Sequence, residues 1–179
     1  MIRKNCDRTT WIVFWIVCSA LIMIFQGVYA QEGKTPFYPN GKYARGIPTP
    51  DEVIGFSLGE RPVRYDETIR YLKTLAEKSP RVRLVESGET HEKRKLYYLL
   101  VSSEGNLARL DGIQEGISKL ADPRKAESED QAQKIIDTTP AIVWMMYSIH
   151  GEELSGTDAS LQLAYQVAAG TDPATENIR

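Results

Sequence analysis

Residues 141–149 have the sequence Ala-Ile-Val-Trp-Met-Met-Tyr-Ser-Ile, the most hydrophobic run of the chain after residue 30. Apolar and polar positions do not alternate cleanly along this run, and its β-branched and aromatic side chains favour a strand that is buried on both faces. Pro140 precedes the run, and His150 follows it at the carboxyl end. Helices and strands arranged around one doubly covered strand are typical of α/β proteins, so the run predicts an α/β fold.

The flanking sequence predicts helices and one hairpin. Thr49-Pro50-Asp51-Glu52 has the spacing of a capping box and should open a short helix that stops at Gly55. Helical periodicity is expected over 65–78, 107–120 and 159–168, and Ser128, with Gln131 three residues on, should cap a further helix. Two strands, one starting at residue 82 and one over 96–101, flank a polar turn over 88–94 and predict a hairpin. The expected inner face of the last helix consists of Ala159, Leu163, Ala164, Val167 and Ala168.

The composition is that of an ordinary globular protein. The 179 residues include 22 Lys and Arg against 24 Asp and Glu, for a net charge of −2, and 42% are hydrophobic. This balance argues against a disordered chain and against a membrane protein with several spans. It also argues against a dedicated nucleic-acid binder, which would carry a basic excess to neutralise phosphates. We therefore expect no nucleic-acid partner.

The first thirty residues differ from the rest and predict a signal peptide. A basic segment over residues 1–8 precedes an apolar run over 11–25, and Val28 and Ala30 are small or apolar at the positions that a signal peptidase inspects. The expected cleavage after Ala30 would export the protein, to the periplasm or the medium; the alternative is an uncleaved membrane anchor. Both cysteines lie in this leader, so the exported part can use neither disulfides nor thiolate metal ligands. The expected organisation is a signal peptide over 1–30, a polar arm over 31–64 and a catalytic-domain segment over 65–179.

Only two histidines are available for a histidine-based site. His91 lies in the polar turn of the hairpin, where a solvated surface residue is expected. His150 follows the hydrophobic run directly, at the end of the strand where α/β sheets place their ligand sites, and Glu153 lies three residues further on. Imidazole and carboxylate both bind zinc, and Gly151 would let the backbone fold tightly between them. On these residues alone, a metal site and a loop histidine beside exposed acids remain equally open.

The wider context resembles the zinc carboxypeptidase family, the metallopeptidases similar to carboxypeptidases A and B. Residues 148–159, Ser-Ile-His-Gly-Glu-Glu-Leu-Ser-Gly-Thr-Asp-Ala, resemble the family's first zinc-ligand motif, which in bacterial members often has the sequence His-Gly-Asn-Glu followed by Ser-Gly. Residues 64–76 look like its first helix and residues 79–102 like its opening hairpin. The resemblance implies a mixed sheet with helices on both faces, incomplete in this chain. It also implies Zn²⁺ with His150 and Glu153 as its first two ligands, and a peptide or protein substrate.

Two departures from the family limit what the resemblance implies. Glu152 stands where digestive members have a substrate-binding arginine, so their substrate preference does not transfer. No histidine follows His150, so the third ligand is absent, and the expected carboxylate-binding arginine, tyrosine and general base also lie downstream in the family. No catalytic residue is therefore assigned, and Glu152, Asp158 and Glu176 are expected to be solvated acids.

Three functions remain open at this point. The first is an exported zinc metallocarboxypeptidase of which this chain is the N-terminal part, inactive by itself. The second is a non-catalytic exported binding module with the same fold. The third is a related zinc amidohydrolase or deacylase, a group that also uses His-x-x-Glu but usually reaches it sooner after the N-terminus.

Overall fold

The computed structural model describes residues 37–179 except 123, 126 and 127. The chain divides into two compact units, 1–39 and 40–179, and the second is described below. The predicted signal peptide over 1–30 and both cysteines lie outside the described residues. In the part that the structure describes, no helix has the length and apolar character needed to cross a membrane.

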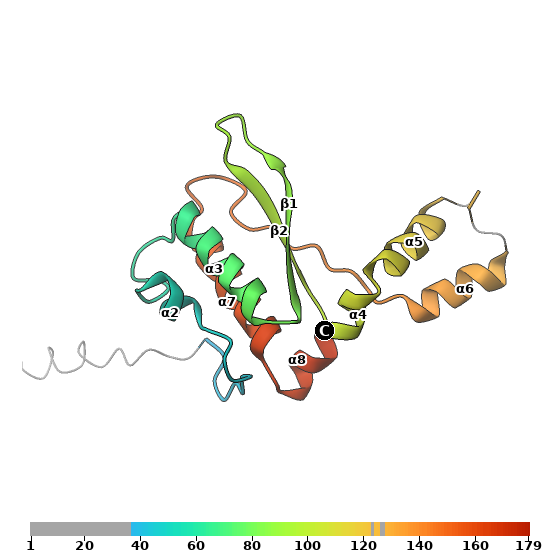
Figure 1. Ribbon diagram of the computed structural model, residues 1–179, viewed down its shortest axis with the longest axis horizontal. Helices are drawn as coiled ribbons and strands as arrows, with labels where there is room; N and C mark the ends of the chain where they lie inside the picture. Colours follow the sequence, from blue (N-terminus) through green and yellow to red (C-terminus); the bar gives the residue numbers. More distant parts are fainter. Residues whose placement is uncertain (1–36, 123, 126–127) are drawn as a thin grey trace, which may run out of the picture. The chain divides into compact units, whose positions relative to one another are not determined.

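Helices and one hairpin follow one another along the second unit (Figure 1). In chain order the elements are α2 (Pro50–Ile54), α3 (Tyr65–Lys78), β1 (Val82–Glu89), β2 (Lys95–Val101), α4 (Glu104–Ala108), α5 (Leu110–Ala121), α6 (Glu129–Thr138), α7 (Leu154–Ala169) and α8 (Pro173–Ile178). Strands β1 and β2 form the predicted antiparallel hairpin, in which Val82 pairs with Val101 and Leu84 with Leu99. The arrangement is consistent with an incomplete α/β carboxypeptidase-like fold.

Helix ends follow the capping residues in the sequence. The Glu52 N–H donates to Thr49 Oγ1 (3.3 Å) and the Thr49 N–H donates to Glu52 Oε2 (2.8 Å), so the predicted capping box is confirmed. Gly55 ends α2 with a φ of +89°, a left-handed value that favours glycine. Ser128 Oγ accepts from the Gln131 N–H (3.2 Å), which confirms the predicted cap of α6.

The helix predicted over 107–120 is broken in two. Helices α4 and α5 meet at Arg109, whose φ of −113° and ψ of 23° are not helical. The guanidinium of Arg109 donates to the Thr138 carbonyl (3.1 Å) and to Asn106 Oδ1 (3.0 Å). These contacts hold the break, and the 3.6-residue pattern alone did not reveal it.

The core lies where α3 and α7 pack together (Figure 1). Tyr71 and Leu75 from α3 and Leu161 and Ala168 from α7 are completely buried. Helix α3 also contacts β1, and α7 contacts β2. The other buried members of this core are Ile54, Val63, Val82, Tyr165 and Ala169.

The buried face of α7 overlaps the predicted one only in part. Of the expected inner face, Ala168 is buried and Ala164 packs partly buried against the core, whereas Ala159 is exposed. The side chains of Leu161, Tyr165 and Ala169, which were not predicted to face inward, are also buried in the core. Apolar side chains occupy most of the circumference of this helix, so the 3.6-residue periodicity did not single out one face as the buried face.

The hydrophobic run over 141–149 does not form a strand in this structure, so the prediction of a doubly buried strand is wrong here. Its side chains are largely exposed; Val143, for example, is 79% exposed. Among the described residues the only sheet is β1–β2, and no strand pairs with this run. Trp144 in this run contacts the ring of Tyr98, at 6.1 Å between centroids. Hydrophobic and β-branched residues favour a strand, but a strand also needs a hydrogen-bonding neighbour.

An ion pair between Arg61, which is partly exposed, and the buried carboxylate of Glu67 fixes the start of α3. The guanidinium of Arg61 donates to both carboxylate oxygens of Glu67, at 2.6 and 3.0 Å, while the Arg64 N–H donates to Glu67 Oε2 at 2.9 Å. The Glu67 side chain is only 5% exposed. Arg61 also lies over the Phe56 ring, 3.7 Å from its centroid. The hydrogen bonds from Arg61, followed by the one from the Arg64 backbone, lower the pKa of Glu67 to about 2.

The pKa of Glu67 predicts acid sensitivity. The ionised carboxylate stabilises the fold above its ordinary pKa of 4.5, and this contribution is lost as the pH falls through about 2. We expect Glu67→Gln to lower the thermal unfolding midpoint at pH 7 and to change it little near pH 2, measured by circular dichroism. The matched control is Glu77→Gln, because Glu77 is exposed on the same helix. A midpoint difference that stays constant from pH 7 to pH 2 would contradict the prediction.

Candidate metal centre

His150 and Glu153 lie together in the turn that leads into α7. His150 Nδ1 is 2.8 Å from Glu153 Oε1, and the His150 N–H donates to Glu153 Oε2 (3.3 Å). In return, the Glu153 N–H donates to the His150 carbonyl (3.2 Å). Their side chains are 65% and 50% exposed, so the two potential ligands are open to solvent. The structure therefore brings together the two residues that the sequence singled out.

The electrostatics of the pair favour an ionised carboxylate. The hydrogen bond from the His150 side chain, followed by that from the His150 backbone, lowers the pKa of Glu153 below its usual value. The imidazole and carboxylate form an ion pair when His150 is protonated. A cation that displaces this proton would find a charged oxygen and a ring nitrogen already facing each other.

The distance between the two donor atoms is compatible with zinc. Two ligands of a tetrahedral zinc, with bonds of about 2.0–2.1 Å, lie about 3.3 Å apart. The observed 2.8 Å between Nδ1 and Oε1 needs only a small opening of the pair. Across residues 37–179, with 123, 126 and 127 left aside, no three or more His, Cys, Asp or Glu side chains are grouped so that they could hold a metal ion. The donor set thus fits zinc in kind and spacing but supplies two ligands.

The tight backbone of this turn does not depend on Gly151, contrary to expectation. Gly151 does not have a positive φ, and a Cβ there would meet nothing within 4 Å. The left-handed residue is Ser148, with a φ of 52°. The crowded glycine is Gly156, where a Cβ would lie 2.7 Å from Ser148 Oγ and 2.9 Å from Ser148 N. The glycine of the Ser-Gly pair in the motif is therefore the one that a close approach requires.

Asp158 is not the solvated acid that the sequence suggested. Its Oδ2 accepts from the Gly59 N–H (3.1 Å) and its Oδ1 from the Val63 N–H (3.2 Å). These bonds join the second turn of α7 to the loop before α3, across almost one hundred residues of sequence. Sequence reasoning missed this role because nothing local in the sequence links the two segments.

Removing the Asp158 carboxylate should destabilise the fold. Asp158→Ala leaves two backbone N–H groups without their acceptor, and we expect the free energy of unfolding to fall by about 1–3 kcal/mol, measured by urea denaturation. Asp158→Asn keeps one acceptor oxygen and should cost less than Asp158→Ala. If both variants were as stable as the wild type, the loop over 59–63 would not be held through this residue.

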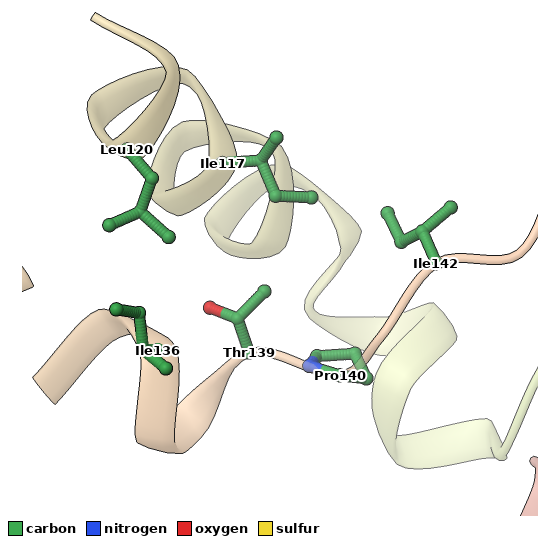
Figure 2. Close-up of a pocket in the computed structure, with 6 residues that line it drawn as sticks. All are labelled: Ile117, Leu120, Ile136, Thr139, Pro140 and Ile142. Atoms are coloured by element: carbon green, nitrogen blue, oxygen red, sulfur yellow. The ribbon is translucent and has the colours of Figure 1, made fainter. Parts of the chain in front are cut away.

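The other histidine and an apolar groove are formed by residues outside this pair. His91 is exposed in the hairpin turn, as predicted. An open groove of about 470 Å³ lies where α5 and α6 meet the residues after α6, and Figure 2 shows the side chains that line it. It is lined by Ile117, Leu120, Ile136, Thr139, Pro140 and Ile142. This lining carries no titratable side chain, so the groove offers no acid, base or metal ligand.

The geometry defines a candidate metal centre at the start of a helix in an α/β domain. A family model described as zinc carboxypeptidase matches residues 68–179, which is more than half of the chain and includes both His150 and Glu153. The chain therefore belongs to the zinc carboxypeptidase family. The match indicates a hydrolase of this type, with Zn²⁺ as the metal. No curated protein and no solved structure matches the chain.

Proposed function

We propose that this chain is the N-terminal part of the catalytic domain of a zinc-dependent metallocarboxypeptidase that hydrolyses peptide bonds in peptides or proteins. The observation that carries the proposal is the His150–Glu153 pair, with Nδ1 and Oε1 2.8 Å apart, inside the segment that matches the family. Both side chains are exposed, which suits a metal that must also meet a substrate.

The two residues would act as metal ligands rather than as acid or base. His150 would offer Nδ1, and Glu153 would offer a carboxylate kept ionised by the hydrogen bonds that lower its pKa. Bound zinc would supply Lewis acidity, which polarises a peptide carbonyl and makes water more acidic. The turn between the hydrophobic run over 141–149 and α7 would hold the two ligands on one short stretch of backbone.

The rest of the catalytic machinery is not among these 179 residues. A catalytic zinc is usually bound by three protein ligands. No histidine follows His150 in this sequence that could be the third. We propose that the third ligand, the general base and the substrate-binding cation come from a continuation of the chain. Reading the DNA beyond the codon for Arg179 tests this directly. An open reading frame would support the proposal, and a stop codon would contradict it.

We also propose that the protein acts outside the cytoplasm, because the basic, apolar and small-residue segments of the leader occur in the order of a signal peptide. Cleavage is expected after Ala30. Contact with a membrane is expected only if the leader is not cleaved.

The decisive experiment uses the protein as its gene encodes it. Purified protein should contain zinc, measured by elemental mass spectrometry. It should hydrolyse members of a broad peptide panel, and chelators should stop the reaction. Folded, zinc-loaded protein that cleaves no peptide would support the non-catalytic binding module instead. Cleavage of N-acyl amino acids without cleavage of peptides would support the amidohydrolase alternative.

A further inference from the structure

We propose that Ser148 is a positioning residue for the metal-ligand pair: its hydroxyl fixes the main chain of Glu153 and thereby sets the distance between the Glu153 carboxylate and His150. This inference rests on the proposed zinc site. Ser148 is not itself a ligand, because its hydroxyl is engaged with the Glu153 carbonyl and the Thr157 hydroxyl.

The backbone of Ser148 is the first observation. Its φ of 52° lies in the left-handed region, which is unfavourable for a residue with a side chain. Glycine would take this conformation without that cost. A serine here therefore needs compensating contacts, and its hydroxyl supplies them.

The hydroxyl forms a short chain of hydrogen bonds. Ser148 Oγ donates to the Glu153 carbonyl at 2.7 Å and lies 3.1 Å from Thr157 Oγ1. Because each hydroxyl has one proton, the Ser148 proton goes to the Glu153 carbonyl and the Thr157 hydroxyl donates to Ser148 Oγ. The main chain of Glu153 is thus held at its N–H by the His150 carbonyl and at its own carbonyl by the Ser148 hydroxyl.

Gly156 makes this arrangement possible. A Cβ at this position would lie 2.7 Å from Ser148 Oγ, closer than the two atoms can approach. Without a side chain, the first turn of α7 lies directly against Ser148. His150 and Glu153 therefore belong to one short loop. This loop begins at Ser148 and ends at the N-terminus of α7, and the Ser148 hydroxyl joins its two ends.

Zinc affinity separates the hydroxyl from the backbone strain. We would measure zinc binding by chelator competition in the gene-encoded protein and in Ser148→Ala, Ser148→Gly and Thr157→Val. Residues that support ligands commonly contribute 10–100-fold in metal affinity. We therefore expect both Ser148 variants to bind zinc about 10–100-fold more weakly, although glycine relieves the φ of 52°. Thr157→Val should weaken binding less, and Ser160→Ala should not weaken it, because the Ser160 hydroxyl bonds only within α7 (2.7 Å to the Thr157 carbonyl).

A metal-free measurement distinguishes failure of this inference from failure of the zinc site. Hydrogen exchange over residues 150–157 should be faster in the Ser148 variants without zinc, because the loop loses its closing bond. Wild-type zinc affinity in Ser148→Gly would overturn the positioning role. If the wild type binds no zinc, the proposed function fails and exchange alone decides: faster exchange in Ser148→Gly supports the inference, and unchanged exchange overturns it.

Discussion

Glu153→Ala should reduce zinc-dependent peptide hydrolysis by the gene-encoded protein by at least about 10²–10³-fold. The carboxylate is one of the two ligands that we propose for this segment, and alanine offers no donor atom in its place. The fold should survive, because the side chain is half exposed and bonds only within its own turn. The measurement is kcat/KM on a cleaved peptide, with zinc content and circular dichroism measured on the same sample.

Glu152→Ala is the matched control for this prediction. Glu152 is the adjacent acid, it is exposed, and its side chain lies outside the contacts that join His150 to Glu153. Its variant should keep the zinc content of the wild type. Glu153→Ala protein that retained zinc and full activity would show that the ligands have been assigned to the wrong residues.

Local chemistry made much of the fold predictable. The capping box of Thr49 and Glu52, the cap at Ser128 and the stop at Gly55 depend on neighbours within a few residues, and each is present in the structure. The hairpin was predictable for the same reason, since its two strands are joined by one short polar turn.

Features that depend on distant neighbours were not predictable. The run over 141–149 has the composition of a buried strand, yet among the described residues nothing pairs with it. The buried face of α7 depends on where α3 packs, which the sequence of α7 does not contain. Register and burial are therefore properties of the partners as much as of the segment itself.

The candidate site shows the same division. That His150 and Glu153 lie together was predictable, because only three residues separate them along the chain. The longer-range contacts nearby were missed, since Ser148 contacts Thr157 nine residues away and Asp158 contacts Gly59 ninety-nine residues away. One local signal was available for Gly156, because it belongs to the Ser-Gly pair of the motif. The physical reason for a glycine there is the close approach of Ser148, which only the structure shows.

The 179-residue chain by itself should bind zinc weakly and exchange it readily. Its described residues offer two potential ligands at the candidate site. A catalytic zinc is usually bound by three protein ligands, and a structural zinc by four. We expect a dissociation constant weaker than about 1 µM, because binding should be well below the roughly 10–16 kcal/mol of structural zinc sites. Isothermal titration calorimetry at pH 7 measures this. No peptide turnover is expected from this chain.

Three alanine variants make the assignment of the weak site testable. His150→Ala and Glu153→Ala should each remove the measurable heat of zinc binding, since a single remaining donor cannot hold the ion. His91→Ala should leave it unchanged, because His91 is exposed in the hairpin turn and forms no part of the pair. Tight zinc binding that survives His150→Ala would mean that the ligands lie elsewhere in the chain. Robust peptide turnover by these 179 residues alone would show that the catalytic groups are already present and have been overlooked.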